Sequence, residues 1–170
     1  MKTFFANLPK ILATIFGLVV AVFIVVAIVN SLFLFKFENQ FETGENLKGT
    51  ECRDTISACG DLTGTDDFTY MAAALIEIKA DAKGVDKKRI KEYYESISFG
   101  LEGAADASHT VKVEVFELDN NTGMFTPSIC PDRTYMFNDV STVRNFDNCY
   151  VVVIYDMGNY APLDYRTYFA

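Results

Sequence analysis

The chain has 170 residues, of which 50% are hydrophobic, and 23 acidic residues outnumber 15 basic ones to give a net charge of −8. Once a membrane helix is set aside, this length has room for one compact domain with a core, but not for two. The acidic balance argues against nucleic acid as a partner.

The first predicted element is an uncharged apolar run over residues 11–35. A helix of these 25 residues is roughly 37 Å long, which exceeds the ~30 Å hydrocarbon core of a bilayer. The apolar region of a cleaved signal peptide is only about 7–15 residues long. No convincing cleavage site follows the run. We therefore expect a cytoplasmic tail over residues 1–10 and an uncleaved signal anchor that forms a transmembrane helix over residues 11–35.

The distribution of charge predicts the orientation of this helix. Residues 1–36 carry Lys2, Lys10 and Lys36 and no acid, and the first carboxylate is that of Glu38. All 23 acidic residues and 12 of the 15 basic ones therefore lie beyond residue 36, where the net charge is −11. Positive residues favour the cytoplasmic side, and Lys36 can extend toward the headgroups. We expect a single-pass protein with a cytoplasmic N-terminus and an extracytoplasmic C-terminal domain.

Small residues follow one face of the predicted transmembrane helix. Ala13, Gly17 and Ala21 are spaced four apart, and Asn30 lies near the outer end. Such a stripe allows a second helix to approach closely, although Ala and Gly are also frequent in membrane helices of any kind. The expected partners are therefore the lipid bilayer and either a protein partner or a second copy bound through this helix.

Four cysteines lie beyond the helix, at Cys52, Cys59, Cys130 and Cys149. An even number of thiols in an oxidising compartment predicts two disulfide bonds, and we expect nearest neighbours in the sequence to pair. Zinc is the alternative, but its ligand pairs are usually two to four residues apart. The first two cysteines fall within residues 36–65, which are rich in turn-forming residues and are expected to form a stalk or loop.

Residues 66–170 are expected to form an α+β domain. The first part, residues 68–80, favours a helix because apolar residues recur at helical spacing, although alternation of the same residues leaves a strand open. A second helix is predicted over residues 87–99, with Asp86 as the N-cap and Gly100 as the stop.

Strands are predicted over residues 109–118, 134–137, 149–156 and 163–169, where apolar residues alternate or run continuously. The expected fold class is α+β, with about two helices and a three- to four-stranded antiparallel sheet in the domain. Asn120 begins an N-glycosylation sequon on a predicted turn.

The sequence contains no recognisable catalytic motif, and we expect no catalytic residue, cofactor or metal. The one histidine, His109, is interpreted as a structural or surface residue. Acidic residues gather near the first cysteine pair and predict a solvated loop, with a Ca²⁺ site as the alternative: Glu51, Asp54, Asp61, Asp66 and Asp67. Cations gather at the start of the second helix and predict a solvated face, with an anionic partner or lipid headgroups as the alternative: Lys87, Lys88, Arg89 and Lys91.

These features predict a non-enzymatic membrane protein whose outer domain is a binding or assembly module, or an accessory subunit of a membrane complex. The long apolar N-terminal helix, the antiparallel sheet and the Cys130–Cys149 loop broadly resemble pilin architecture, which implies a filament subunit as the alternative. The chain departs from pilins because it has no glycine-containing cleavage site before the apolar run and no glutamate just inside it. A membrane-tethered, metal-dependent hydrolase is a further alternative.

Overall fold

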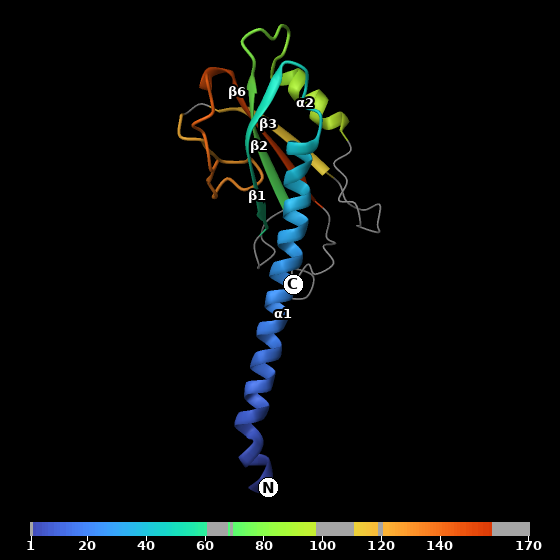
Figure 1. The fold of residues 1–170 in the computed structure, drawn as a ribbon, viewed down its shortest axis with the longest axis vertical. Helices are drawn as coiled ribbons and strands as arrows, with labels where there is room; N and C mark the ends of the chain where they lie inside the picture. Colours follow the sequence, from blue (N-terminus) through green and yellow to red (C-terminus); the bar gives the residue numbers. More distant parts are fainter. Residues whose placement is uncertain (1, 61–67, 69, 98–110, 119–120, 158–170) are drawn as a thin grey trace.

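The computed structural model describes residues 2–60, 68, 70–97, 111–118 and 121–157 (Figure 1). Its main elements are one very long helix, one short helix and a four-stranded antiparallel sheet. The expected α+β class is therefore confirmed. The strand predicted over residues 163–169 and the turn at Asn120 lie outside the described residues.

Helix α1 runs from Lys2 to Thr43 and has two halves with different surroundings. At 1.5 Å per residue it is about 63 Å long. Residues 7–29, the projecting half, extend away from the sheet, and Phe16 in this half is 71% exposed. Residues 30–43, the packed half, lie against the sheet, and Phe37 is fully buried there. The stretch from Asn7 to Thr43 is long and apolar enough to cross a membrane, judged by length and composition.

Of the stalk expected over residues 36–65, the structure describes residues 36–60, and most of these form regular structure. Helix α1 continues to Thr43 because Phe37 and Phe41, one turn apart, both pack into the core. Strand β1 then spans Thr50–Cys59. The expectation of a loop was wrong for these segments, since the polar residues that suggested a loop bond to α1.

Strand β2 spans Tyr70–Ile78, where a helix was favoured and a strand was the alternative. Its side chains alternate between the two faces of the sheet, and both faces are covered, so nearly every residue is buried. Successive alanines favour a helix locally. Here the small side chains of Ala72 and Ala74 pack against α1 and α2. These contacts between distant segments stabilise the strand instead of a helix.

The sheet has the order β1-β2-β6-β3, with every neighbouring pair antiparallel. Strand β6 spans Cys149–Asp156, as predicted, and β3 spans Val111–Glu117, within the predicted range. At one end of the sheet the pairing forms a row across all four strands, consisting of Cys59, Tyr70, Asp156 and Val111.

Different segments cover the two faces. The packed half of α1 and helix α2, Lys87–Ser96, cover one face, and Asp86 caps α2 as predicted by accepting a bond from the Arg89 amide at 2.9 Å. Residues 118 and 121–149 cover the other face with a small aromatic core. This segment contains β4 (Met124–Phe125), β5 (Tyr135–Met136) and the 3-10 turn η1 (Phe146–Asn148).

Candidate functional site

A polar contact joins α1 to the end of the sheet. The hydroxyl of Tyr70 donates to the side-chain carbonyl oxygen of Asn30 at 2.8 Å. Tyr70 is only 2% exposed, so its hydroxyl has little access to water and needs a protein partner. Asn30 lies near the outer end of the expected transmembrane helix. The structure shows that its carbonyl oxygen already accepts a bond within the chain.

A second polar contact lies in the packed half of α1, closer to the C-terminal end of the helix. One carboxylate oxygen of Glu38 accepts a bond from Ser57 at 2.6 Å, and the other accepts from Thr55 at 2.9 Å. The Thr55 hydroxyl also lies 3.3 Å from a carboxylate oxygen of Glu42. Bonds to a charged acceptor are stronger than neutral ones. These bonds therefore fasten the edge strand β1 to α1.

Together these bonds fix how α1 is rotated relative to the sheet. Phe37 and Phe41 are buried in the core between them. Any rotation of the helix would pull both aromatic side chains out of the core and break the bonds to Asn30 and Glu38. The two halves of α1 are also one continuous helix. The direction in which each face of the projecting half points is thus set by the domain.

The small residues identified in the sequence lie on an exposed side of α1, away from the buried side chains of Phe37 and Phe41. Ala13, Gly17 and Ala21 are all exposed, and a side chain added at Gly17 would meet no atom within 4 Å. With about 100° of rotation per residue, Phe37 lies about 160° around the helix axis from Gly17, whereas Phe35 lies almost in line with it. We call this side, which carries the three small residues and Phe35, the outward face.

A buried carboxylate holds the opposite end of the sheet. Glu77 is 4% exposed and accepts bonds from Arg53 at 2.6 Å and from the backbone amides of Arg144 and Asn145 at 3.1 and 2.8 Å. Both carboxylate oxygens are used, so this group fastens the loop before β6. A hollow of about 520 Å³ lies beside it, and its lining carries charges of both signs. Glu51, one of the acids noted in the sequence, pairs there with Arg53 at 3.0 Å.

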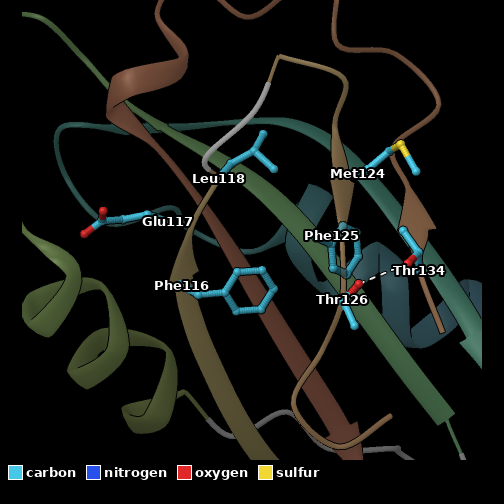
Figure 2. A pocket seen from close by; sticks show the side chains of 7 residues that line it. All are labelled: Phe116, Glu117, Leu118, Met124, Phe125, Thr126 and Thr134. Atoms are coloured by element: carbon cyan, nitrogen blue, oxygen red, sulfur yellow. Dashed lines mark hydrogen bonds between the residues drawn. The ribbon is translucent and has the colours of Figure 1, made fainter. Parts of the chain in front are cut away.

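A second hollow, of about 400 Å³, separates the end of β3 from the β4–β5 hairpin (Figure 2). The rings of Phe116 and Phe125 are 6.0 Å apart, and the hydroxyls of Thr126 and Thr134 are 3.1 Å apart. Glu117 contributes a carboxylate but points away from the aromatic rings (Figure 2). The lining residues contain no nucleophile paired with a base, which acyl-transfer chemistry would require.

All four cysteines are described, and no disulfide bond joins them in the structure. The expected Cys52–Cys59 bond is incompatible with β1, because seven residues of strand separate their Cα atoms by about 23 Å, whereas a disulfide needs about 4–7 Å. The Cys130 thiol contacts the Tyr135 hydroxyl at 3.8 Å, and the Cys149 thiol donates to the Asn145 carbonyl at 3.3 Å.

Burial affects the acidity of two of these thiols. It raises the pKa of Cys52 to about 12, with a further contribution from the nearby charges of Glu42 and Asp54. It raises the pKa of Cys149 to about 11, and the charge of Glu77 adds to this effect. Both groups are therefore neutral thiols at physiological pH, which makes them poor nucleophiles and poor metal ligands.

The remaining candidates from the sequence are the acidic residues, His109, Asn120 and the cations of α2. Among the described residues, no three His, Cys, Asp or Glu side chains are close enough together to hold a metal. Asp54 accepts a bond from the Asp139 amide at 2.9 Å. His109, Asn120 and three of the acids (Asp61, Asp66 and Asp67) lie outside the described residues. The cations of α2 follow the Ile78 end of β2, far from the projecting half of α1, and two of them form exposed pairs with acids four residues on.

Comparison with known proteins adds no identification, because no protein family model, curated protein or solved structure matches this chain.

Proposed function

We propose that this chain is a single-pass membrane protein, without enzymatic activity, whose extracytoplasmic domain is a binding or assembly module or an accessory subunit of a membrane complex. One observation carries this proposal: the same helix supplies an exposed apolar stretch over residues 7–29 and a buried part of the domain core over residues 30–43. An exposed apolar helix of this length is covered by lipid when it spans a bilayer.

The rigid junction gives this arrangement a use in assembly. Because Glu38 and the aromatic residues of the packed half fix the rotation of α1, a contact made on the outward face also fixes how the domain points. The outward face is unobstructed at Gly17, since a side chain added there would meet no atom within 4 Å. A second helix bound along Ala13, Gly17 and Ala21 would thus orient two domains relative to each other.

Substitution at Gly17 tests this proposal. Gly17→Ile keeps the helix apolar and long enough to insert, but it adds bulk where a second helix would approach, at a cost of about 1–2 kcal/mol. Val22→Ile, which adds one methylene, is the control away from this face, because Val22 is exposed and lies about 140° around the axis from Gly17. We expect crosslinking in native membranes to a partner or second copy to weaken in the first variant alone. Equal crosslinking in both variants would contradict assembly through this face.

A pilin-like filament subunit is the second candidate. It is favoured by the combination of a helix with a projecting apolar half and a packed half lying on a four-stranded antiparallel sheet. N-terminal sequencing of the protein from its own membranes separates the two candidates. Cleavage next to the apolar run supports the filament subunit, and an intact Met1 supports the accessory subunit.

A further inference from the structure

Polar contacts show which residues of α1 lie beside each residue of the edge strand β1. Thr55 bonds to both Glu38 and Glu42, whereas Ser57 bonds to Glu38, so Thr55 lies nearer the C-terminal end of α1 than Ser57 does. The step from Thr55 to Ser57 covers about 7 Å along the strand, and the step from Glu42 to Glu38 covers about 6 Å along the helix. The strand and the helix therefore run side by side in opposite directions with nearly equal rise.

The same spacing locates the end of the sheet. Cys59 follows Ser57 by one more step and therefore lies at the level of Leu34, which packs against the core. Cys59 pairs with Tyr70, so the end row of the sheet lies at this level too. The Tyr70 ring extends from this row about one helical turn toward the N-terminus of α1, where its hydroxyl bonds to Asn30.

Below this level, the length of the projecting apolar helix matches a bilayer. From Ile11 to Asn30 the helix rises about 30 Å, which equals the usual thickness of the hydrocarbon core. The exposed cation Lys10 immediately precedes this stretch. We infer that the hydrocarbon ends at Asn30 and that the Tyr70 end of the sheet is seated on the lipid headgroup layer. This inference depends on the proposed membrane span, and it adds the position of the domain relative to the bilayer.

A boundary at Phe35, the end of the apolar run in the sequence, does not fit the fold. It would raise the hydrocarbon by about 7.5 Å and submerge the end row of the sheet. The bonded side chains of Tyr70 and Asn30 would then lie within the hydrocarbon, where polar groups are costly. The domain itself therefore limits how deeply α1 can insert.

Two exposed apolar residues mark the headgroup layer on the outward face. Leu32 is 58% exposed and Phe35 is 65% exposed, although both are level with the domain rather than below it. They lie about 3 and 7.5 Å above Asn30, within the headgroup region on one side of a bilayer. Apolar and aromatic side chains are well accommodated at this depth. Lipid headgroups are thus the proposed occupant of the surface at Leu32 and Phe35, whereas a second helix would bind at Gly17, about 27 Å from Phe35 along α1.

Tryptophan fluorescence can measure these depths, because the chain contains no tryptophan. Three variants of the full-length protein, each with one tryptophan, are reconstituted in phosphatidylcholine vesicles: Val20→Trp, Ile28→Trp and Phe35→Trp. One set of vesicles contains lipid brominated on its acyl chains, and another contains iodide on both sides. We expect brominated chains to quench Val20→Trp and Ile28→Trp strongly. Iodide is expected to quench Phe35→Trp several-fold more than Val20→Trp.

Each alternative gives a different pattern. If brominated chains quench Phe35→Trp as strongly as Ile28→Trp, the hydrocarbon reaches Phe35 and the inference is wrong. If neither quencher reaches Phe35→Trp, a second copy of the chain covers that surface, which also refutes a headgroup contact. If brominated chains quench neither Val20→Trp nor Ile28→Trp, the helix does not span the bilayer, and the proposed function itself fails.

Discussion

The hydroxyl of Tyr70 on β2 donates to the side-chain carbonyl oxygen of Asn30, 40 residues earlier on α1, at a distance of 2.8 Å. Tyr70 is buried among the core residues that cover the helix-packed face of the sheet. The contact is made where the projecting half of α1 meets the domain, so it ties the exposed apolar helix directly to a central strand. Its loss is therefore expected to loosen the junction as well as the local packing.

A double-mutant cycle tests this bond. Tyr70→Phe removes the hydroxyl and keeps the ring, and we expect the free energy of unfolding in detergent to fall by about 1 kcal/mol. Asn30→Ala should cost a similar amount, and the double variant should cost little more than either one, because both remove the same bond. Tyr150→Phe, on the partly exposed part of β6, is the control. Fully additive losses would show that the two residues do not interact.

The Glu38 contact should matter more than an exposed acid. Glu38→Ala removes the acceptor of Ser57 and one acceptor of the buried Thr55 hydroxyl, and we expect it to reduce the free energy of unfolding by about 2 kcal/mol. Glu45→Ala, just beyond α1 and exposed, is expected to change the free energy of unfolding by less than about 0.5 kcal/mol. Thermal unfolding followed by circular dichroism measures both. Equal effects would contradict a structural role for the Glu38 carboxylate.

Two ion pairs provide a sharper contrast. Glu77→Ala leaves the mostly buried Arg53 side chain and two backbone amides without their acceptor, so we expect a loss of about 3–5 kcal/mol. Glu92→Ala breaks an exposed pair with Lys88, 3.7 Å long, and should cost less than about 0.5 kcal/mol. Denaturant unfolding of the two variants side by side decides the matter. A small loss for Glu77→Ala would mean that the loop before β6 is held by other contacts.

Much of this architecture was predictable because it is encoded by neighbouring residues. The apolar run, the capped helix after Asp86 and the uniformly apolar strand over residues 149–156 all show local patterns. Strand β2 was not favoured because it is covered on both faces, and its alanines favour a helix until α1 and α2 pack against them. Strand β1 was missed because residues such as Thr55 and Ser57 suggest a loop, whereas their partner, Glu38, belongs to the distant helix α1.

The candidate site, too, could be predicted only where neighbouring residues encode it. The small residues of the outward face could be found from their spacing, but their position on an exposed side of α1 depends on which side of α1 packs. That side is set by Phe37 and Phe41, whose helical spacing is readable only once α1 is known to continue to Thr43. The role of Asn30 could not be inferred either, because its partner Tyr70 lies in a segment for which a helix was favoured and a strand left open.

The raised thiol pKa values predict slow alkylation of the folded protein. Cys149, with a pKa of about 11, is ionised to about one part in a thousand at pH 8, whereas an unfolded cysteine with a pKa of about 8.5 is ionised to about a quarter. We expect iodoacetamide to modify Cys149 at least about 100-fold more slowly in the folded protein than in urea. Mass spectrometry of the peptide containing Cys149 follows the reaction. Failure to react in urea without reductant would reveal a disulfide and contradict this prediction.

The same shift links stability to pH. Because folding raises the pKa of Cys52 and Cys149, the unfolded chain loses their protons first as pH rises. Their contribution to stability is therefore complete below about pH 8.5 and falls as pH rises toward about 11. The midpoint of urea unfolding should decrease between pH 8 and pH 10.5, and Cys149→Ala should reduce the size of that decrease. An unchanged pH dependence in this variant would show that other groups cause it.

The charge asymmetry around the apolar helix predicts its orientation in the membrane. The flank before Ile11 carries Lys2 and Lys10 and no acid, while the chain beyond residue 36 has a net charge of −11. Retention of the positive flank in the cytoplasm places the domain outside. Protease added to sealed right-side-out vesicles should therefore remove a C-terminal tag and spare an N-terminal one, and permeabilised vesicles, as the control, should lose both. Protection of the C-terminal tag in sealed vesicles would reverse the topology and place the seated end of the sheet on the cytoplasmic leaflet.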